Sequence, residues 1–268
     1  MTDISSLLAS YDQVILDLDG CVWVGDHVIE GSPEAIAALR AAGKRVAFAT
    51  NNSWYPGEEQ VTRLWGHGIQ ASLADVVTAG GAMQHLLAET RTGQTAFVIG
   101  ADSLRRHVSD AGLALVDGTD HANHADVVVV GGTDRFNYAV LRTAALAVRN
   151  GAYLVATARD PTLPMPGGPW PGTGAILAAV EVASDATAEI VGKPAGQLME
   201  TAVDRLGDGR TLVIGDRLDS DIAAAAAAGL DGALVFSGDA DVVPELVDGD
   251  PRPVATASNL AALVFAEG

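Results

Sequence analysis

Hydrophobic residues in this chain gather in short runs, and small or polar residues follow most of them. The runs cover residues 14–16, 45–49, 76–78, 98–99, 127–130, 153–156, 211–214 and 233–236. Apolar runs without strict alternation are typical of strands buried on both faces, as in a parallel sheet. Between the runs, the pattern predicts helices over 34–42, 57–67, 103–111, 138–150, 175–183, 197–206 and 222–228. This alternation of strands and helices predicts an α/β fold.

The first strand, the first helix and the second strand form a unit. Gly31, Ser32 and Pro33 precede the helix, and we expect Ser32 to be its N-cap with Pro33 in the first turn. Two strands joined by one helix in so short a segment lie parallel and adjacent. The end of the second strand is therefore expected beside the end of the first.

The pattern of strands and helices starts again near Ala79, in a second α/β unit with few acidic residues at its strand ends. This unit closes with a proline- and glycine-rich loop over 160–174. So long a loop inside a compact protein is usually either functional or mobile, and we expect a functional one. A chain of 268 residues suits one core with an insertion better than two independent domains. We therefore predict a core over 1–79 and 191–268, interrupted by a cap domain over 80–190.

The composition adds a strong acidic bias, with 34 Asp and Glu against 16 Lys and Arg and a formal charge of −18. Such a surface repels nucleic acid and anionic membranes, so neither is expected as a partner. Small anions can still bind where cations and amides are concentrated, because exposed charges are screened beyond roughly 8 Å at physiological salt. Cys21 is the one cysteine, which excludes an internal disulfide and fits a reducing compartment. We therefore expect a cytoplasmic protein.

The first strand delivers two acidic residues to its carboxyl end, where chemistry is located in this class of sheet. Asp17 and Asp19 are two positions apart, so their side chains share one face of extended backbone, and a turn at Gly20 brings the second over the first. One carboxylate can then attack while the other transfers protons. The alternative is a strand that merely ends at a solvated turn, and this short motif alone does not separate the two.

Further polar groups follow later strands: Thr50, Asn51 and Asn52, then Lys193, then Asp216 and Asp221. If these strand ends share one sheet edge, the site holds at least three carboxylates and one ammonium. Carboxylates this close repel one another unless a divalent cation lies among them. Hard oxygen ligands without a cluster of His and Cys indicate Mg²⁺ rather than zinc.

In the order of these motifs, the chain resembles the haloacid dehalogenase-like superfamily, and in particular its NagD-type phosphatase branch with a large α/β cap. The resemblance is carried by Asp19-Gly20-x-x-Trp23, Ala49-Thr50-Asn51-Asn52-Ser53, Pro171-Gly172-Thr173-Gly174, Val191-Gly192-Lys193-Pro194 and Gly215-Asp216-Arg217-Leu218. It covers nearly the whole chain. It implies a Rossmann-like parallel-sheet core with an inserted α/β cap domain. It also implies a Mg²⁺-dependent phosphatase for small phosphate monoesters, of the glycerol phosphate, sugar phosphate or nucleotide type.

The resemblance also assigns roles to the acidic residues. Asp17 is implied as the nucleophile that becomes an aspartyl phosphate, and Asp19 as the group that protonates the leaving oxygen and then activates water. The implied Mg²⁺ ligands are the Asp17 carboxylate, the Asp19 backbone carbonyl and Asp216. Asp221 is expected in contact with the ion or just behind it. The alternative for Asp221 is an ordinary acidic residue in the first turn of a helix.

The remaining motif residues are implied to bind the substrate. Thr50 and Asn51, with amides around Asn52, are expected to hold the phosphoryl oxygens. Lys193 is expected to neutralise the nucleophile and the transferring group. Phosphoryl transfer depends mainly on positioning and on charge stabilisation, which a lysine and a divalent cation supply together.

The cap loop departs from the pattern of the branch. Ala158 replaces the commoner Asn of a Thr-Asn-x-Asp stretch, and Leu163 stands where the pyridoxal phosphate phosphatases carry a His. A specialist for pyridoxal phosphate is therefore not expected. Arg159 either reaches a second polar part of the substrate or is simply solvated. The resemblance further suggests a homodimer formed through the cap.

Two other functions stay open at this point. A receiver-like signalling protein also gathers acids, a Thr and a Lys on a parallel sheet and is phosphorylated on Asp, but receivers are much shorter and lack an inserted domain. A metal-free dehalogenase of the same superfamily has no use for Asp19 or Asp216. A stable phosphoprotein without turnover of small esters would favour the receiver.

Overall fold

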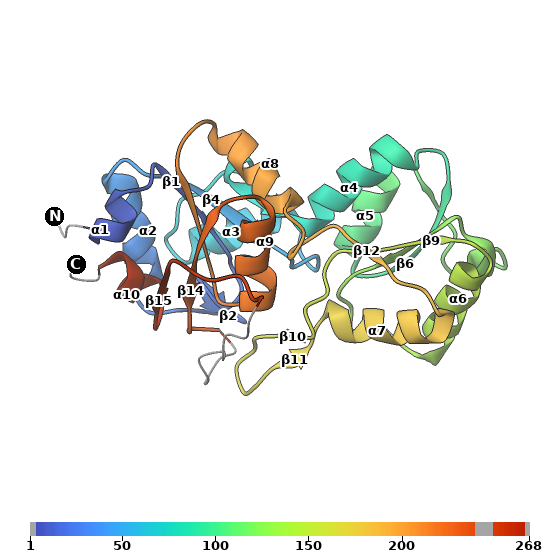
Figure 1. Cartoon of the computed structure of the whole chain (residues 1–268). Coiled ribbons are helices and arrows are strands. Elements are labelled where there is room, and N and C mark those ends of the chain that lie inside the picture. Colours follow the sequence, from blue (N-terminus) through green and yellow to red (C-terminus); the bar gives the residue numbers. More distant parts are fainter. Residues whose placement is uncertain (1–3, 239–248, 266–268) are drawn as a thin grey trace.

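The computed structural model describes residues 4–238 and 249–265. Two parallel sheets lie in separate halves of the molecule, and helices flank each of them (Figure 1). The parallel strands before residue 79 and after residue 210 form one sheet, whereas the parallel strands between residues 95 and 190 form the other. The α/β fold class is confirmed. Within the described ranges, no helix has the length and hydropathy needed to cross a membrane.

The larger sheet has the order β15, β14, β13, β1, β4, β5. Its strands are β1 (Gln13–Leu16), β4 (Arg45–Thr50), β5 (Val76–Thr78), β13 (Thr211–Gly215), β14 (Asp231–Val235) and β15 (Ala255–Ala257). All of its pairings are parallel, and β4 lies next to β1 as expected. The chain winds to one side of β1 through β4 and β5 and to the other side through β13 and β14. The direction of winding therefore reverses between β1 and β13, and open parallel sheets bind ligands at such a reversal.

Helices cover both faces of this sheet. The first face packs against α1 (Ser6–Ala9), α2 (Ser32–Ala41), α3 (Gly57–Gly66) and α10 (Leu260–Val264). The second face packs against α4 (Ala79–Thr90), α8 (Gln197–Leu206) and α9 (Ala223–Ala227). Alternate residues of β1 serve the two cores, because successive side chains of a strand point to opposite faces.

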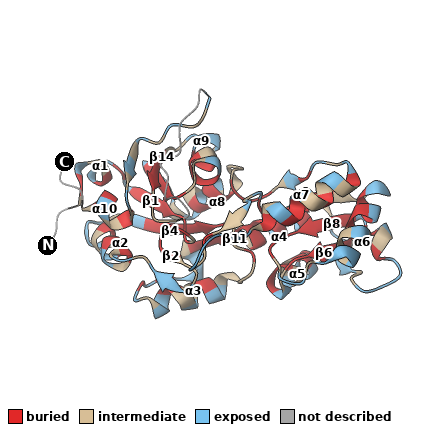
Figure 2. Cartoon of the chain, turned by 90° about the horizontal axis from the view of Figure 1, so that it is seen from below, coloured by how far each residue is buried: buried red, intermediate tan, exposed pale blue. Residues whose placement is uncertain are grey.

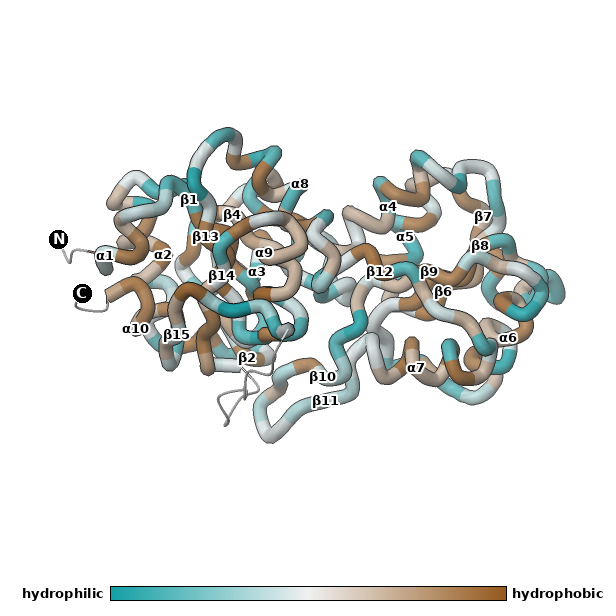
Figure 3. Tube along the Cα trace, in the orientation of Figure 1, coloured by the Kyte–Doolittle hydropathy of each residue, from teal (hydrophilic) through white to brown (hydrophobic). Residues whose placement is uncertain are grey.

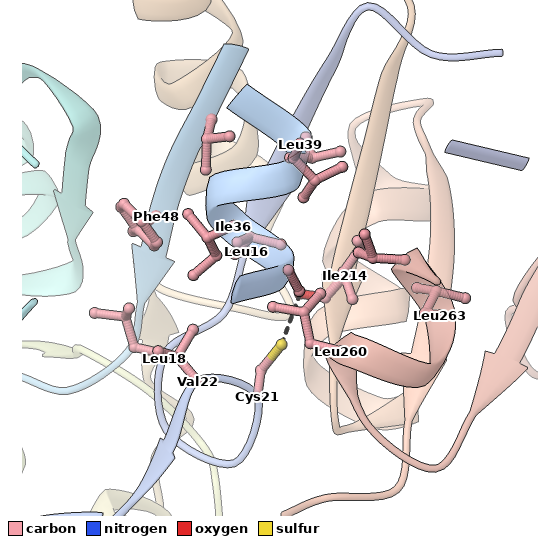
Figure 4. Close-up of a cluster of buried hydrophobic side chains, with 14 of the residues drawn as sticks. Leu16, Leu18, Cys21, Val22, Ile36, Leu39, Phe48, Ile214, Leu260 and Leu263 are labelled. Atoms are coloured by element: carbon pink, nitrogen blue, oxygen red, sulfur yellow. Dashed lines mark hydrogen bonds between the residues drawn. The ribbon is translucent and has the colours of Figure 1, made fainter. Parts of the chain in front are cut away.

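Cys21 belongs to the first of these cores. Figure 4 shows it among Leu16, Ile214 and Leu260, with its Sγ 3.9 Å from the carbonyl oxygen of Ile214. Burial raises the pKa of the Cys21 thiol well above its usual value. The lone cysteine is therefore a small apolar packing residue rather than a reactive group.

The second sheet has the order β12, β9, β8, β6, β7. Its strands are β6 (Thr95–Ile99), β7 (Ala114–Leu115), β8 (Val127–Val130), β9 (Tyr153–Ala156) and β12 (Glu189–Ile190). Helices α4 and α5 (Asp102–Asp110) cover one face, while α6 (Tyr138–Arg149) and α7 (Thr173–Ser184) cover the other. The four valines of β8 are fully buried and alternate between the two cores. Figure 2 shows the central strands of both sheets as buried, and Figure 3 shows β6 and β8 as strongly hydrophobic.

Short elements complete the described chain. They are the hairpin of β2 (Trp23–Val24) and β3 (His27–Val28), the hairpin of β10 (Thr162–Leu163) and β11 (Trp170–Pro171), the 3₁₀ turns Leu73–Asp75 and Ala122–His124, and a π-helical turn over Leu218–Ile222. The β10–β11 hairpin extends from the second half toward the first (Figure 1). The loop expected over 160–174 is therefore partly ordered as a hairpin.

Two local expectations were wrong. Ser32 is not an N-cap: Gly31, at φ +80°, caps α2, and the buried Ser32 hydroxyl donates instead to the carbonyl of Cys21 at 3.4 Å. The helix expected over 222–228 begins earlier, with a π-helical turn, because both Asp221 and Ile222 donate their amides to the carbonyl of Arg217. This turn moves Asp221 from the start of a helix to the inner side of the strand end.

Candidate active site

The site lies where β1 and β13 end side by side, at the reversal of winding in the larger sheet. Asp17 follows β1 directly and Asp216 follows β13 directly, so the parallel register brings the two carboxylates to one edge. Lys193 arrives from the segment that returns from the second sheet. The convergence expected from the sequence is therefore present in the structure.

Lys193 lies inside an acidic cluster. Its ammonium donates to Oδ1 of Asp17, to Oδ1 of Asp221 at 2.6 Å and to the carbonyl of Ala49 at 3.3 Å. The side chains of Lys193, Asp17 and Asp221 are only 3%, 7% and 1% exposed. An ion pair this buried is stable only with close geometry and further hydrogen bonds, because both charges have lost their water.

The charges within this cluster do not balance. Asp17, Asp216 and Asp221 offer carboxylate oxygens that lie within 4.8 Å of one another, against the single ammonium of Lys193. Burial raises the pKa of Asp17 well above its usual value, and Lys193 offsets this only in part. Burial and the neighbouring Asp221 raise the pKa of Asp216 to about 8. Burial alone would lower the pKa of Lys193, but Asp17 and Asp221 reverse that effect and raise it.

This donor set fits a divalent cation. Three buried carboxylates supply hard oxygen ligands of the kind that Mg²⁺ prefers. Gly20, at φ +94°, lies so close that a Cβ at this position would overlap the Asp216 carboxylate, so glycine lets the turn after β1 close over the cluster. A dication among these oxygens would favour their charged forms and lower their pKa values. The residues present therefore match the Mg²⁺ expected from the sequence.

Asp19 lies beside the cluster, half-buried and held by hydrogen bonds. Trp23 donates its indole N–H to Oδ1 at 3.1 Å, and Thr50 and Asn52 donate to Oδ2 at 3.3 and 3.2 Å. Thr50 also accepts the backbone N–H of Asn52 at 3.0 Å. Asp19 is thus fixed in one orientation next to Asp17, and the structure brings the expected pair of acids together.

Asn51 binds the backbone of Lys193. Its Oδ1 accepts the Lys193 N–H at 2.8 Å, and its Nδ2 donates to the Lys193 carbonyl at 3.0 Å and to Oδ2 of Asp160 at 2.6 Å. The side-chain amide that the resemblance assigns to phosphoryl oxygens is therefore bound to protein groups in this structure.

Three residues lie at the site to which the sequence pattern assigned no role. Trp54, Asp160 and Arg217 line a cavity of about 70 Å³ together with the acidic cluster. Arg217 follows Asp216, and its Nε lies 3.6 Å from Oδ1 of Asp160. The sequence offered only indirect signals for them. Trp54 follows the Thr50-Asn51-Asn52 motif, Arg217 follows Asp216, and Asp160 lies in the cap loop. Arg159 does not line this cavity, because it forms a bidentate ion pair with Glu181 at 2.7 and 2.8 Å.

The fold and this cluster define a class, the hydrolases that work with buried aspartates and a lysine at the edge of a parallel sheet. The chain belongs to the haloacid dehalogenase-like hydrolase family. Residues 14–114 match the family model described as haloacid dehalogenase-like hydrolase, and residues 190–263 match a model described as HAD-hydrolase-like. The family expected from the motifs is confirmed.

Named relatives of this chain are phosphatases. The D-glycerol 3-phosphate phosphatase of Mycobacterium tuberculosis is 37% identical over 87% of this chain, which spans 65% of that protein's length. An acid sugar phosphatase of Staphylococcus aureus is 31% identical, with 86% of this chain and 88% of that protein covered. The crystal structure of the glycerol phosphate phosphatase of M. tuberculosis in complex with magnesium matches with a TM-score of 0.82 at 35% identity, covering 96% of this chain and 78% of that one. The same protein has also been solved with calcium.

Proposed function

We propose that this chain is a Mg²⁺-dependent phosphatase that hydrolyses small phosphate monoesters through an aspartyl phosphate on Asp17. The observation that carries the proposal is the cluster of Asp17 with the carboxylates of Asp216 and Asp221, in which Lys193 pairs with Asp17 and Asp221, at the point where the winding of the sheet reverses. Membership of the hydrolase family and the phosphatase relatives support it.

In the first step, Asp17 attacks phosphorus and the bond to the leaving oxygen breaks. Lys193 holds Oδ1 of Asp17, so Oδ2 is the oxygen that we assign to the attack. Asp19 gives a proton to the leaving oxygen, from an orientation set by Trp23, Thr50 and Asn52. In the second step, Asp19 takes a proton from water, the water oxygen attacks phosphorus, and the bond to Asp17 breaks.

Charge stabilisation supports both steps. Asp17, the Asp19 carbonyl and Asp216 would hold Mg²⁺, which would supply positive charge against the transferring phosphoryl group. Lys193 neutralises the nucleophile, and its place between Asp17 and Asp221 keeps the ammonium fixed during the reaction. Thr50 and Asn52 hold Asp19 and stand beside the expected position of the phosphoryl oxygens. We assign Asp221 to the lysine and to the rim of the metal site.

The leaving group is a short polyol or sugar rather than a nucleoside. The cavity measures about 70 Å³, whereas pockets for drug-sized ligands typically measure ~300–1,000 Å³. Trp54, Leu163 and Pro164 form its apolar wall, and Asp160 and Arg217, which pair with each other, also line it. This arrangement suits a few carbons that carry hydroxyl groups.

Three further expectations belong to this proposal. The core comprises 1–79 and 191–268 and the cap 80–190, which agrees with the membership of the two sheets. The buried lone thiol suits a reducing, cytoplasmic setting. A homodimer through the cap would use its exposed apolar side chains, among which are Tyr138, Leu146 and Val182.

Phosphate release from p-nitrophenyl phosphate tests the proposal. We expect turnover that requires Mg²⁺, stops with EDTA and falls at least about a thousandfold in Asp17→Asn. Asp204→Asn, an exposed carboxylate on α8, is the matched control and should retain full activity. Turnover that survives Asp17→Asn would contradict the nucleophile, and a stable phosphoprotein without turnover would favour a receiver. A screen of polyol, sugar and nucleoside monoesters then ranks the leaving groups.

A further inference from the structure

The loop after β9 sends one carboxylate into the site of the other half of the molecule. Oδ2 of Asp160 accepts the side-chain amide of Asn51 at 2.6 Å, and its Oδ1 lies 3.6 Å from Nε of Arg217. The Asp160 side chain is only 18% exposed. Both oxygens therefore meet groups from the larger sheet, although Asp160 belongs to the segment between the second sheet and the β10–β11 hairpin.

Asn51 has its amide committed on both sides. Oδ1 accepts from the Lys193 N–H, while Nδ2 donates to the Lys193 carbonyl and to Asp160. Turning the amide over would place N–H groups against the Lys193 N–H and an oxygen against two acceptors, so one orientation satisfies all three bonds. The packing is close, because a Cβ on Gly192 would overlap Oδ1 of Asn51.

Lys193 is consequently fixed at two ends. Asn51 binds its backbone from both the N–H and the carbonyl side, and Asp17 and Asp221 bind its ammonium. A shift of the Lys193 backbone would move the ammonium relative to Asp17. The backbone bonds made by Asn51 thus bear directly on the charge next to the nucleophile.

Asp160 and Arg217 also make contacts at the base of the β10–β11 hairpin. The backbone carbonyl of Asp160 accepts the N–H of Gly174 at the start of α7 at 2.8 Å, and Arg217 donates to Oγ1 of Thr162 at 3.4 Å. Leu163 and Pro164 of this segment line the cavity. Asp160 and the β10–β11 hairpin are therefore held against the end of the larger sheet by the same set of contacts.

We propose that Asp160 is a positioning residue that couples seating of the β10–β11 hairpin to the placement of Lys193, through the side-chain amide of Asn51. The inference rests on the proposed phosphatase function. When the hairpin is seated, Asp160 fixes the one orientation of Asn51 that also holds the Lys193 backbone. When the hairpin is away, Asn51 loses one of its three bonds and Lys193 is held less firmly.

A double-mutant cycle on phosphate release tests the coupling. Asp160→Ala should lower kcat roughly tenfold on p-nitrophenyl phosphate, whose aryl group needs no polar contact from the loop, and leave KM within about twofold. Asn51→Ala should lower kcat at least as much, and the double variant no further than Asn51→Ala alone. Losses that multiply in the double variant, or an Asp160→Ala effect confined to KM, would overturn the inference.

Two further variants separate the contacts of Asp160. Asp160→Asn keeps an acceptor for Asn51 and should retain most of kcat, whereas a loss equal to that of Asp160→Ala would overturn a relay through Asn51. Asp219→Ala removes a carboxylate that pairs with Arg217 at 2.9 Å without touching Asn51. We expect it to lower kcat much less than Asp160→Ala, and an equal loss would assign the effect to Arg217 and overturn the proposal.

Hydrogen exchange on the full chain gives a readout that does not depend on activity. The Lys193 amide donates to Asn51, so Asp160→Ala should raise its exchange rate roughly tenfold, while Asp219→Ala leaves it unchanged. An unchanged Lys193 amide in Asp160→Ala would overturn the coupling even if the enzyme is an active phosphatase. A raised exchange rate in a chain without phosphatase activity would uphold the coupling and contradict the proposed function alone.

Discussion

The two parallel sheets of this chain end in different surfaces. In both, the winding reverses next to the first strand of the sheet, between β1 and β13 in one and between β6 and β8 in the other. The edge of the second sheet even holds the larger cavity, about 210 Å³ against about 70 Å³. Size and topology therefore do not separate the edge that carries chemistry from the edge that does not.

Charge balance does separate them. At the edge of the second sheet, Arg105 pairs with Asp117 at 2.9 Å and Arg135 pairs with Asp102 at 3.1 Å, so each cation there meets its own carboxylate. At the edge of the larger sheet, three buried carboxylates lie within 4.8 Å of one another, and Lys193 pairs with only two of them, Asp17 and Asp221. Burying unbalanced charge lowers the stability of a protein. Clusters of this kind are therefore found mainly at functional sites.

Removing the lysine should have the largest effect. Lys193→Met leaves Asp17 and Asp221 buried without their cation, so we expect phosphate release to fall at least about a thousandfold and the free energy of unfolding of the metal-free protein to fall by about 3 kcal/mol. Denaturant unfolding in EDTA and a phosphate assay in Mg²⁺ measure the two losses. A variant as stable as the parent would mean that Lys193 is not what holds these carboxylates.

The pH dependence of stability should be next in size. With a pKa of about 8 in the folded protein, Asp216 holds a proton between roughly pH 4 and 8, where an unfolded Asp does not. The folded state then binds more protons than the unfolded state, so stability of the metal-free protein decreases as pH rises through this window, by up to about 1.4 kcal/mol per pH unit. Below pH 4 this dependence of stability on pH is absent, since Asp216 is protonated in both the folded and the unfolded state.

Mg²⁺ should reverse this trend, because it binds the deprotonated carboxylates and its stabilisation therefore grows with pH. Unfolding in EDTA and in Mg²⁺ from pH 5 to pH 8 measures both slopes. Asp216→Asn is the control, since the difference between it and the parent removes the contribution of the histidines. Equal slopes in the two proteins would show that Asp216 does not carry the unbalanced charge.

The sequence was sufficient to predict the edge but not the contacts made from the other sheet. Asp17, Lys193 and Asp216 could be placed together because parallel strands bring their carboxyl ends to one side, whatever the details of packing. The hydrogen bonds from Asn51 to the Lys193 backbone could not be predicted, because they depend on how the segment that carries Lys193 lies against the end of β4. Asp160 was hidden for the same reason: its partners come from the other sheet.

Local misjudgements have the same origin. Ser32 has the residue type and position of an N-cap, but a buried carbonyl of Cys21 claims its hydroxyl and Gly31 takes the capping position. The helix expected to begin at Ile222 begins earlier, with a π-helical turn that carries Asp221 inward to Lys193, in keeping with its expected place at or just behind the ion. In each case a tertiary partner outweighed a local preference that sequence can measure.

The smallest effect is expected from the paired edge. Arg105→Met makes the same kind of change as Lys193→Met, from a cation to an apolar side chain of similar length. It removes an ion pair whose members are 30% and 21% exposed and a bond to the carbonyl of Val98 at 2.7 Å. Because water reaches Asp117 in part, we expect a loss of only about 1–2 kcal/mol in the free energy of unfolding.

Phosphate release should be unchanged in Arg105→Met, because the pair lies outside the cavity that holds Asp17. The same unfolding and phosphate assays as for Lys193→Met place the two variants on one scale. A large loss of turnover in Arg105→Met would mean that the edge of the second sheet takes part in catalysis. The contrast in charge balance would then no longer tell a structural edge from a functional one.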